Sequence, residues 1–195
     1  MKFPEGLPYE TDFHREQLFL LIATLRPYLR ARQVQAYVSG NTFIHYLPTK
    51  PPRVIGPDFY VVLDQTPEER PAYVAWEEGG KLPSVIVELT HESTEAYDRG
   101  DKYILYRDTF KTAEYFLYDP LQHRLEGFDW VEERYLPKSG DAQSGMLCNT
   151  LQLELRLDDR WLRWFERDGR KLPNDQELAD FYYGSRPVHT SQDLP

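Results

Sequence analysis

The chain has 195 residues, of which 41% are hydrophobic; this is enough for one sizeable core, and we expect one domain spanning residues 1–195. The formal net charge of -9 argues against a protein that grips phosphate backbones over a broad basic surface. Cys148 is the single cysteine, which excludes an intramolecular disulfide and a thiolate metal cluster within one chain. The sequence has no apolar run of about eighteen residues and no signal-peptide pattern, so we expect a cytoplasmic protein without a membrane partner.

The first predicted element is a helix that Thr11 or Asp12 can cap. Its apolar positions repeat with a helical period: Leu18, Leu21, Ile22, Leu25 and Leu29. Pro27 is expected to kink or end this helix, because proline removes a backbone donor and clashes with the preceding turn. Residues 34–47 read as two strands around a Ser-Gly-Asn turn, a pattern typical of a hairpin, and residues 48–57 as a Pro-rich connection.

Two strands at residues 59–63 and 84–90 follow, joined by a charged, Gly-containing loop over residues 64–82. A helix is predicted over residues 95–107, with Ser93 or Thr94 as its cap. Three of its side chains are spaced four residues apart and therefore share one face: Asp98, Lys102 and Tyr106.

The remaining strands are predicted from short alternating or apolar runs: residues 114–118, a hairpin of 123–128 with 131–136, and 151–157 with one wet face. A C-terminal helix over residues 174–183 begins with Asn174 and Glu177, which are spaced as a capping box. The tail at residues 184–195 is expected to be flexible or docked on a partner.

Glu88 is the one charged residue in the run Val85-Ile86-Val87-Glu88-Leu89, which reads as a central strand with two apolar faces. Burying an unpaired carboxylate there would cost several kcal/mol, so another group must compensate it. Two explanations stay open from the residues alone. Glu88 is either a salt-bridged structural residue or a metal ligand.

Asp58 follows Pro57 at the start of a strand, where Pro-Asp also commonly marks a turn. Together with Glu88, however, it offers two carboxylates to a hard cation such as Mg²⁺. Lys102 would complete this site if its helix packs over the end of the strand. The alternative for Lys102 is a solvated lysine paired with Asp98 one turn earlier.

The order and spacing of four blocks resemble the Uma-two family of restriction endonucleases, in the PD-(D/E)XK nuclease superfamily, over residues 10–160. The first block is Gly56-Pro57-Asp58-Phe59 and the second is Val87-Glu88-Leu89-Thr90 followed by Ser93-Thr94. The third runs from Asp98-Arg99-Gly100-Asp101-Lys102 through Tyr106, and the fourth is Ala113-Glu114-Tyr115-Phe116-Leu117-Tyr118-Asp119-Pro120.

The resemblance implies an α/β (α+β) fold with a restriction-endonuclease-like core, in which helices flank a mixed central β-sheet and additional hairpins are attached. It implies Asp58 and Glu88 as ligands of Mg²⁺ or Mn²⁺, with the main-chain carbonyl of Leu89 as a further ligand. The superfamily lysine usually lies two residues after the acidic residue, where this chain has Thr90. The motif position of the displaced lysine points to Lys102.

Three further residues are kept as additional site candidates: Glu16, Thr90 and Asp98. Glu16 is included because superfamily members often add a carboxylate from a helix, and its alternative is an exposed helix charge. The implied activity is metal-dependent endonucleolytic hydrolysis of DNA, by a homodimer.

The alternative function is a catalytically silent nuclease fold that serves as an interaction or regulatory module, which the acidic composition and Thr90 favour. RNA or branched DNA would require the same chemistry as duplex DNA, and the sequence does not separate these substrates. The sequence contains no zinc-ligand spacing, no GxSxG elbow, no GxGxxG motif and no Walker loop, which excludes several other enzyme classes.

Overall fold

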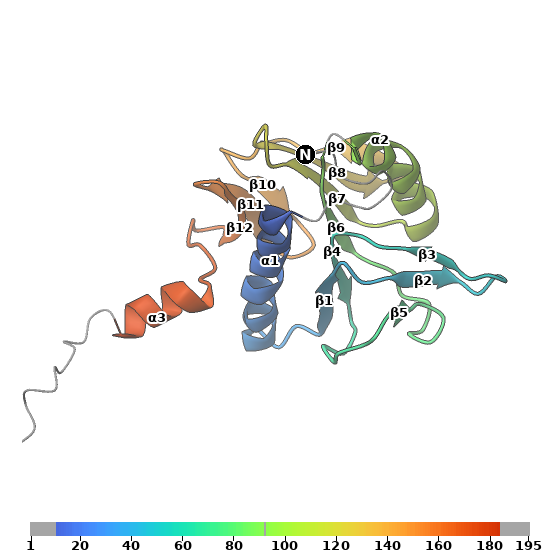
Figure 1. The fold of residues 1–195 in the computed structure, drawn as a ribbon, viewed down its shortest axis with the longest axis horizontal. Helices are drawn as coiled ribbons and strands as arrows, with labels where there is room; N and C mark the ends of the chain where they lie inside the picture. The colour runs from blue at the N-terminus through green and yellow to red at the C-terminus, as the bar shows by residue number, and fades with distance from the viewer. Residues whose placement is uncertain (1–10, 92, 184–195) are drawn as a thin grey trace, which may run out of the picture.

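A mixed six-stranded sheet forms the centre of the computed structural model, which describes residues 11–91 and 93–183. The strands lie in the order β1-β4-β6-β7-β8-β9 (Figure 1). Their bounds are Ala36–Gly40 (β1), Phe59–Leu63 (β4), Val85–Leu89 (β6), Glu114–Asp119 (β7), Arg124–Val131 (β8) and Arg134–Pro137 (β9). β6 and β7 are parallel and every other neighbouring pair is antiparallel, so the prediction of a mixed central sheet is confirmed. The predicted tail at residues 184–195 lies outside the described residues.

Helices and two small sheets surround the central sheet. One small sheet has the order β10-β11-β12, and the other has the order β3-β2-β5. Their strands are Met146–Cys148 (β10), Leu153–Asp158 (β11), Trp161–Glu166 (β12), Arg53–Ile55 (β3), Ile44–Leu47 (β2) and Tyr73–Val74 (β5). The helices are Asp12–Ala31 (α1), Glu95–Tyr97 (α2) with the π-helical segments Asp98–Lys102 (η1) and Leu105–Phe110 (η2), and Asp175–Tyr183 (α3). No helix in the described part of the chain is both long and apolar enough to cross a membrane.

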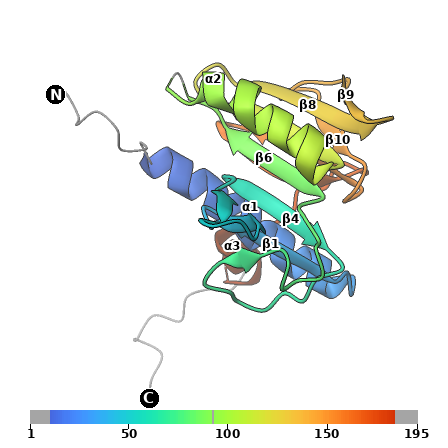
Figure 2. The same ribbon diagram turned by 90° about the vertical axis from the view of Figure 1, so that its right-hand side faces the viewer.

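The central sheet is buried on both faces, which explains the continuous apolar runs in its strands. α1 and the β10-β11-β12 sheet cover one face, while the helix that begins at α2 and the β3-β2-β5 sheet cover the other (Figures 1 and 2). In β4, Phe59 and Val61 pack toward α1, whereas Tyr60 and Val62 pack toward the other layer. The two-residue period of a strand thus assigns each side chain to one of two cores.

α1 begins at the predicted cap and continues past Pro27. Thr11 is its N-cap, and its hydroxyl accepts a hydrogen bond from the His14 N–H at 3.1 Å. Pro27 lies inside the helix and does not end it. Pro27 is exposed, while Leu25 and Leu29 on either side of it are buried, so tertiary packing outweighs the local cost of proline.

The predicted hairpin over residues 34–47 is wrong, although both strands exist. β1 pairs with β4, and β2 joins a different sheet, where it pairs with β3 and β5. Gly40 does not serve a two-residue turn; it lets β1 approach β4 so closely that a Cβ there would collide with the carbonyl oxygen of Asp58. The N–H of Asn41 continues this contact by donating to the carbonyls of Pro57 and Asp58.

Four strands were not predicted from the sequence: β3, β5, β10 and β12. The predicted second helix was also too short. β3 and β5 lie in segments predicted as connections, and both form only by pairing with β2. The predicted helix over residues 95–107 continues to Phe110 through wider π-helical turns. The predicted hairpin of β8 with β9 is confirmed.

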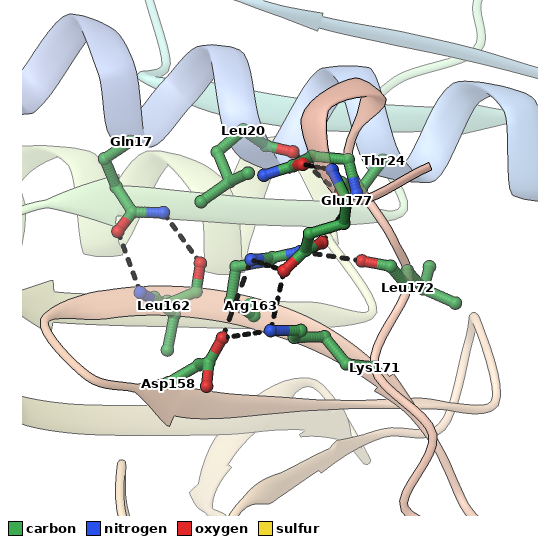
Figure 3. Close-up of polar contacts among 10 residues, drawn as sticks. Gln17, Leu20, Thr24, Asp158, Leu162, Arg163, Lys171, Leu172 and Glu177 are labelled. Atoms are coloured by element: carbon green, nitrogen blue, oxygen red, sulfur yellow. Dashed lines mark hydrogen bonds and ion pairs between the residues drawn. The ribbon is translucent and has the colours of Figure 1, made fainter. Parts of the chain in front are cut away.

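A polar network ties the C-terminal segment to β12 (Figure 3). The Arg163 guanidinium donates to the Leu172 carbonyl at 2.9 Å and to the Glu177 carboxylate at 2.7 Å. Lys171 bridges Asp158 and Glu177 at 2.6 and 2.7 Å. Glu177 also forms the predicted capping box, since its carboxylate accepts the backbone N–H at position 174 and its own N–H donates to the side chain there.

Gln17 attaches α1 to the same strand. Its side-chain amide donates to the Leu162 carbonyl and accepts from the Leu162 N–H, both at 2.8 Å, and the pair is fully buried (Figure 3). The amide therefore makes the two hydrogen bonds that a neighbouring strand would make, and it pairs the buried N–H and C=O of Leu162.

The Gln17→Met substitution should lower the free energy of unfolding by about 2–4 kcal/mol, because it leaves both Leu162 backbone groups buried without partners. Chemical denaturation measures the change. The matched exposed substitution Gln122→Met should change the unfolding free energy by less than about 0.5 kcal/mol. Equal stabilities for the two variants would contradict a bridging role for Gln17.

Candidate active site

Asp58 and Glu88 lie opposite each other on the face of the central sheet that packs against the second helix. The β4–β6 register pairs Phe59 with Val87, and Asp58 and Glu88 are one position further along. The Asp58 N–H donates to Glu88 Oε2 at 3.0 Å, and the Leu89 N–H donates to Asp58 Oδ2 at 2.7 Å. Each carboxylate is thus fixed by the main chain of the other strand.

Glu88 is completely buried, and three polar groups compensate it. Besides the Asp58 N–H, it accepts the Tyr106 hydroxyl at 2.8 Å and lies 3.0 Å from Lys102 Nζ. Burial, and then the charge of Asp58, raise the pKa of Glu88 to about 8, while Lys102 acts in the opposite direction. The sheet therefore holds a carboxyl group that exchanges its proton near neutral pH.

Lys102 and Asp98 come from one face of the helix, as their spacing predicts, and both are buried. Lys102 Nζ lies 2.9 Å from Asp98 Oδ1 and 3.0 Å from Glu88 Oε2, so Lys102 is not a solvated surface lysine. Burial lowers the pKa of Lys102, but the carboxylates of Glu88, Asp98 and Asp58 together raise it above its ordinary value. Lys102 therefore remains an ammonium group.

Asp98 carries a buried oxygen without a hydrogen bond of ordinary geometry. Burial raises the pKa of Asp98, and Lys102 opposes this shift. Among the residues that the structure describes, Asp98 Oδ1 forms an ion pair with Lys102, and the Thr94 side chain also lowers the pKa of Asp98, while Oδ2 makes no hydrogen bond of ordinary geometry. Asp98 Oδ2 is thus a buried oxygen that a water molecule or a cation would satisfy.

His14 is a site residue that the sequence analysis did not identify. Its Nε2 lies 3.4 Å from Asp58 Oδ1, and the two side chains are 20% and 17% exposed. Burial raises the pKa of Asp58, but the His14 side chain, Lys102 and the Leu89 N–H hold it below the usual value. Its position in the sequence could have indicated this role, because His14 lies one helical turn before the buried Leu18 and therefore on the same face of the helix.

Glu16, the candidate from the same helix, lies elsewhere. Two residues correspond to about 200° around an α-helix, so Glu16 points away from the face that carries His14. Glu16 is exposed and lines a different pocket, together with Phe19 and Trp161. The helical contributor beside Asp58 is therefore an imidazole rather than a carboxylate.

These side chains surround an open pocket of about 660 Å³. His14, Asp58, Leu89, Asp98 and Lys102 line it, and Glu88 lies beneath them. Thr90, at the position of the usual superfamily lysine, is buried, and its hydroxyl donates to the carbonyl of Tyr118 at 3.3 Å. The helix thus supplies the ammonium group that the strand lacks.

The donor set fits a hard divalent cation. Asp58, Leu89 and Asp98 line the pocket, and Asp98 Oδ2 is a buried oxygen without a hydrogen bond of ordinary geometry. Glu88 lies behind this lining, and a cation would have to replace Lys102 or the Asp58 N–H at its Oε2. Among the described residues, no three His, Cys, Asp or Glu side chains are grouped as a ready cage for a metal. Mg²⁺ needs no such cage, because it commonly takes one or two carboxylates and completes its shell with water and phosphate oxygens.

Comparison with known proteins gives the family and the fold. The model of the Uma2 family, described as "Putative restriction endonuclease", matches residues 5–160. The crystal structure of "a putative nuclease belonging to DUF820" from Anabaena variabilis ATCC 29413 is similar, with a TM-score of 0.55 and 13% sequence identity. The match covers 79% of this chain and 83% of that one, so the two share a fold. No curated protein matches the sequence.

In metal-free buffer, Glu88→Gln should become more stable relative to wild type as the pH rises from about 5 to 8. The raised pKa of about 8 means that folded Glu88 keeps a proton which the unfolded chain releases near pH 4.3. The stability contributed by neutral Glu88 is fully present below about pH 4.3 and is lost as the pH rises through about 8. The substituted glutamine does not titrate, and denaturation across this range measures the difference.

Glu177→Gln is the control, because Arg163 and Lys171 lower the pKa of Glu177 to about 2 against the effect of burial. The stability that charged Glu177 contributes is present above about pH 4.3 and is lost as the pH falls toward 2. Its difference from wild type should therefore stay flat between pH 5 and 8. A flat profile for Glu88→Gln as well would mean that folded Glu88 is charged throughout this range.

Proposed function

The chain belongs to the Uma2 restriction-endonuclease family, and we propose that it hydrolyses phosphodiester bonds in DNA with Asp58, Glu88 and Lys102, using Mg²⁺ or Mn²⁺. Family and fold are those of a nuclease. One observation carries the proposal: Glu88 is fully buried in a central strand, yet it contacts both Asp58 and Lys102 at the base of an open pocket. A purely structural glutamate would need neither the second carboxylate nor the pocket.

Asp58, Glu88 and the Leu89 carbonyl would hold the cation. When bound, a divalent cation polarises a phosphate group and lowers the pKa of a bound water molecule. The chain positions these ligands in advance, because the Leu89 N–H orients Asp58, and Tyr106 and the Asp58 N–H orient Glu88. Such orientation by neighbouring groups reduces the reorganisation needed during reaction.

Lys102 would act on the phosphate. During hydrolysis a water oxygen bonds to phosphorus, one P–O ester bond breaks, and negative charge increases on the phosphoryl and leaving oxygens. The neighbouring carboxylates keep Lys102 protonated, so it can donate a hydrogen bond to one of these oxygens. Asp98 is a positioning residue, since its carboxylate lies 2.9 Å from the ammonium group and sits one turn before it on the same helix.

We further propose that the protein works in the cytoplasm. We also propose that it is a homodimer, because a twofold pair would present two sites to one nucleic acid. This is an analogy with nucleases that cut both strands of a duplex. Sedimentation velocity of the full chain tests it, and a monomer at micromolar concentration would contradict it.

Glu88→Gln should abolish calorimetric binding of Mg²⁺ and Mn²⁺ at millimolar metal and reduce plasmid nicking by roughly 100-fold or more. Glu16→Gln is the matched control, because Glu16 is exposed on another surface, and it should leave both measurements unchanged. If folded wild type neither binds metal nor nicks DNA, Glu88 is structural and the fold serves as an interaction module.

Lys102→Met should separate metal binding from catalysis. Loss of the ammonium group should lower the nicking rate about 10²–10³-fold, as expected for a group that stabilises developing charge. The same change removes a cation from between Glu88 and Asp98, so the affinity for Mg²⁺ should stay the same or rise. Calorimetry and nicking on one preparation check both effects, with the exposed substitution Lys81→Met as control.

Parallel loss of metal affinity and nicking in Lys102→Met, with its folding intact by circular dichroism, would contradict this division of roles. It would instead assign to Lys102 a purely structural part in holding the two carboxylates.

A further inference from the structure

The pocket above Asp58 offers little free positive charge to a phosphate backbone. Of its lining residues that the structure describes, Lys102 alone is a lysine or arginine, and Glu88 and Asp98 already neutralise it. Arg99, about one turn before Lys102, forms ion pairs with Glu95 and Glu126. Proteins that hold a DNA duplex gain much of their affinity from contacts between such side chains and phosphates. The substrate must gain affinity in another way.

Two exposed aromatic rings line the same pocket: Phe43, which is 65% exposed, and Tyr97, which is 47% exposed. Phe43 lies next to Gly56, two residues before Asp58, since a Cβ at Gly56 would be 3.6 Å from Phe43 Cδ1. The Tyr97 ring centroid lies 5.6 Å from Lys102 Nζ. Phe43 thus lies on the side of the pocket that carries Asp58, and Tyr97 lies on the side that carries Lys102.

Many aromatic rings on this side of the central sheet are buried, including those of Tyr60, Tyr106 and Tyr115. Phe43 and Tyr97 are exposed and line the pocket, whereas the other exposed Phe, Tyr and Trp rings that the structure describes, those of Phe19, Trp76 and Phe181, do not line it. An aromatic ring exposed to water lacks the stabilisation that aromatic rings gain when they are buried in the core. An exposed ring that lines a pocket gains this stabilisation when a ligand with a flat apolar surface covers it.

Nucleobases provide such a surface. A base that stacks on an aromatic side chain gains affinity without a charged partner, and every base can do so because each has a π-face. In an intact duplex both faces of a base are already stacked on neighbouring pairs, so only unpaired bases are available. The rings therefore favour a single strand or an unpaired stretch over a continuous duplex.

We propose that the pocket binds an unpaired stretch of nucleic acid whose bases stack on Phe43 and Tyr97, which places the connecting phosphate beside Asp58 and Lys102. This inference rests on the proposed function, because it names the substrate class of the same site. It also accounts for an acidic nuclease: stacking replaces a large part of the phosphate contacts, so binding should depend only weakly on salt.

The test measures fluorescence anisotropy of labelled oligonucleotides of one sequence, as single-stranded DNA, single-stranded RNA and duplex DNA. The protein is the full-length Lys102→Met variant with Mg²⁺, so that binding is observed without turnover. At least one single-stranded form should bind more tightly than the duplex. On this background, Phe43→Ala and Tyr97→Ala should each weaken single-strand binding by about 5- to 150-fold, the loss expected for one base–aromatic stack.

Phe19→Ala is the matched control, because Phe19 is 68% exposed and lines a different pocket, and it should leave binding unchanged. Tyr97→Phe keeps the ring and should retain most of the affinity, which separates stacking from loss of the hydroxyl. Duplex binding as tight as single-strand binding would overturn the inference. So would Phe43→Ala and Tyr97→Ala variants that bind single strands as tightly as Phe19→Ala.

Failure of this inference is distinguishable from failure of the proposed function. Cleavage that depends on Glu88, with substitutions at Phe43 and Tyr97 having no effect, would overturn the stacking inference and leave the nuclease proposal intact. Ring-dependent binding of single strands, without cleavage by wild type at any metal concentration, would support the stacking inference and overturn the nuclease proposal.

Discussion

The burial of one carboxylate, that of Glu88, constrains the whole site. A charged group at the centre of a sheet with two apolar faces is costly unless hydrogen bonds and opposite charge surround it. Here three groups from two separate segments provide those partners: the backbone N–H of Asp58 before β4, and the Tyr106 hydroxyl and Lys102 ammonium from the second helix. The partners of Glu88 therefore also tie β4, β6 and the helix together.

The same constraint explains how an ammonium group reaches the site without the usual lysine on the strand. The Thr90 hydroxyl and N–H both donate to the Tyr118 carbonyl of the neighbouring strand, and the ammonium group beside Glu88 is that of Lys102 on the second helix. The helix continues there in π-helical turns, and Lys102 lies in the first of them. Such turns are rare in helices and are frequent at functional sites. An ammonium group on the helix can therefore pair with Glu88 in place of a lysine on the strand.

Acidity and nuclease chemistry are compatible in this molecule because the charges are local. Asp58, Glu88 and Asp98 lie around one lysine and one histidine, so with Glu88 deprotonated the site carries a net negative charge that a divalent cation would offset. A site of this kind gains its affinity for nucleic acid from the cation and from contacts that carry no charge. The exposed rings beside it are such contacts.

The sequence by itself determined the apolar strands, the helical periods, the anomalous Glu88 and the face that Lys102 shares with its neighbours, because these follow from local periodicity and from the cost of burying charge. Only the tertiary structure decided how distant segments pair. It separated the two strands of residues 34–47 into different sheets and placed His14, rather than Glu16, beside Asp58. Strand partners and the orientation of a helix depend on contacts between distant segments, and the local sequence pattern does not specify those contacts.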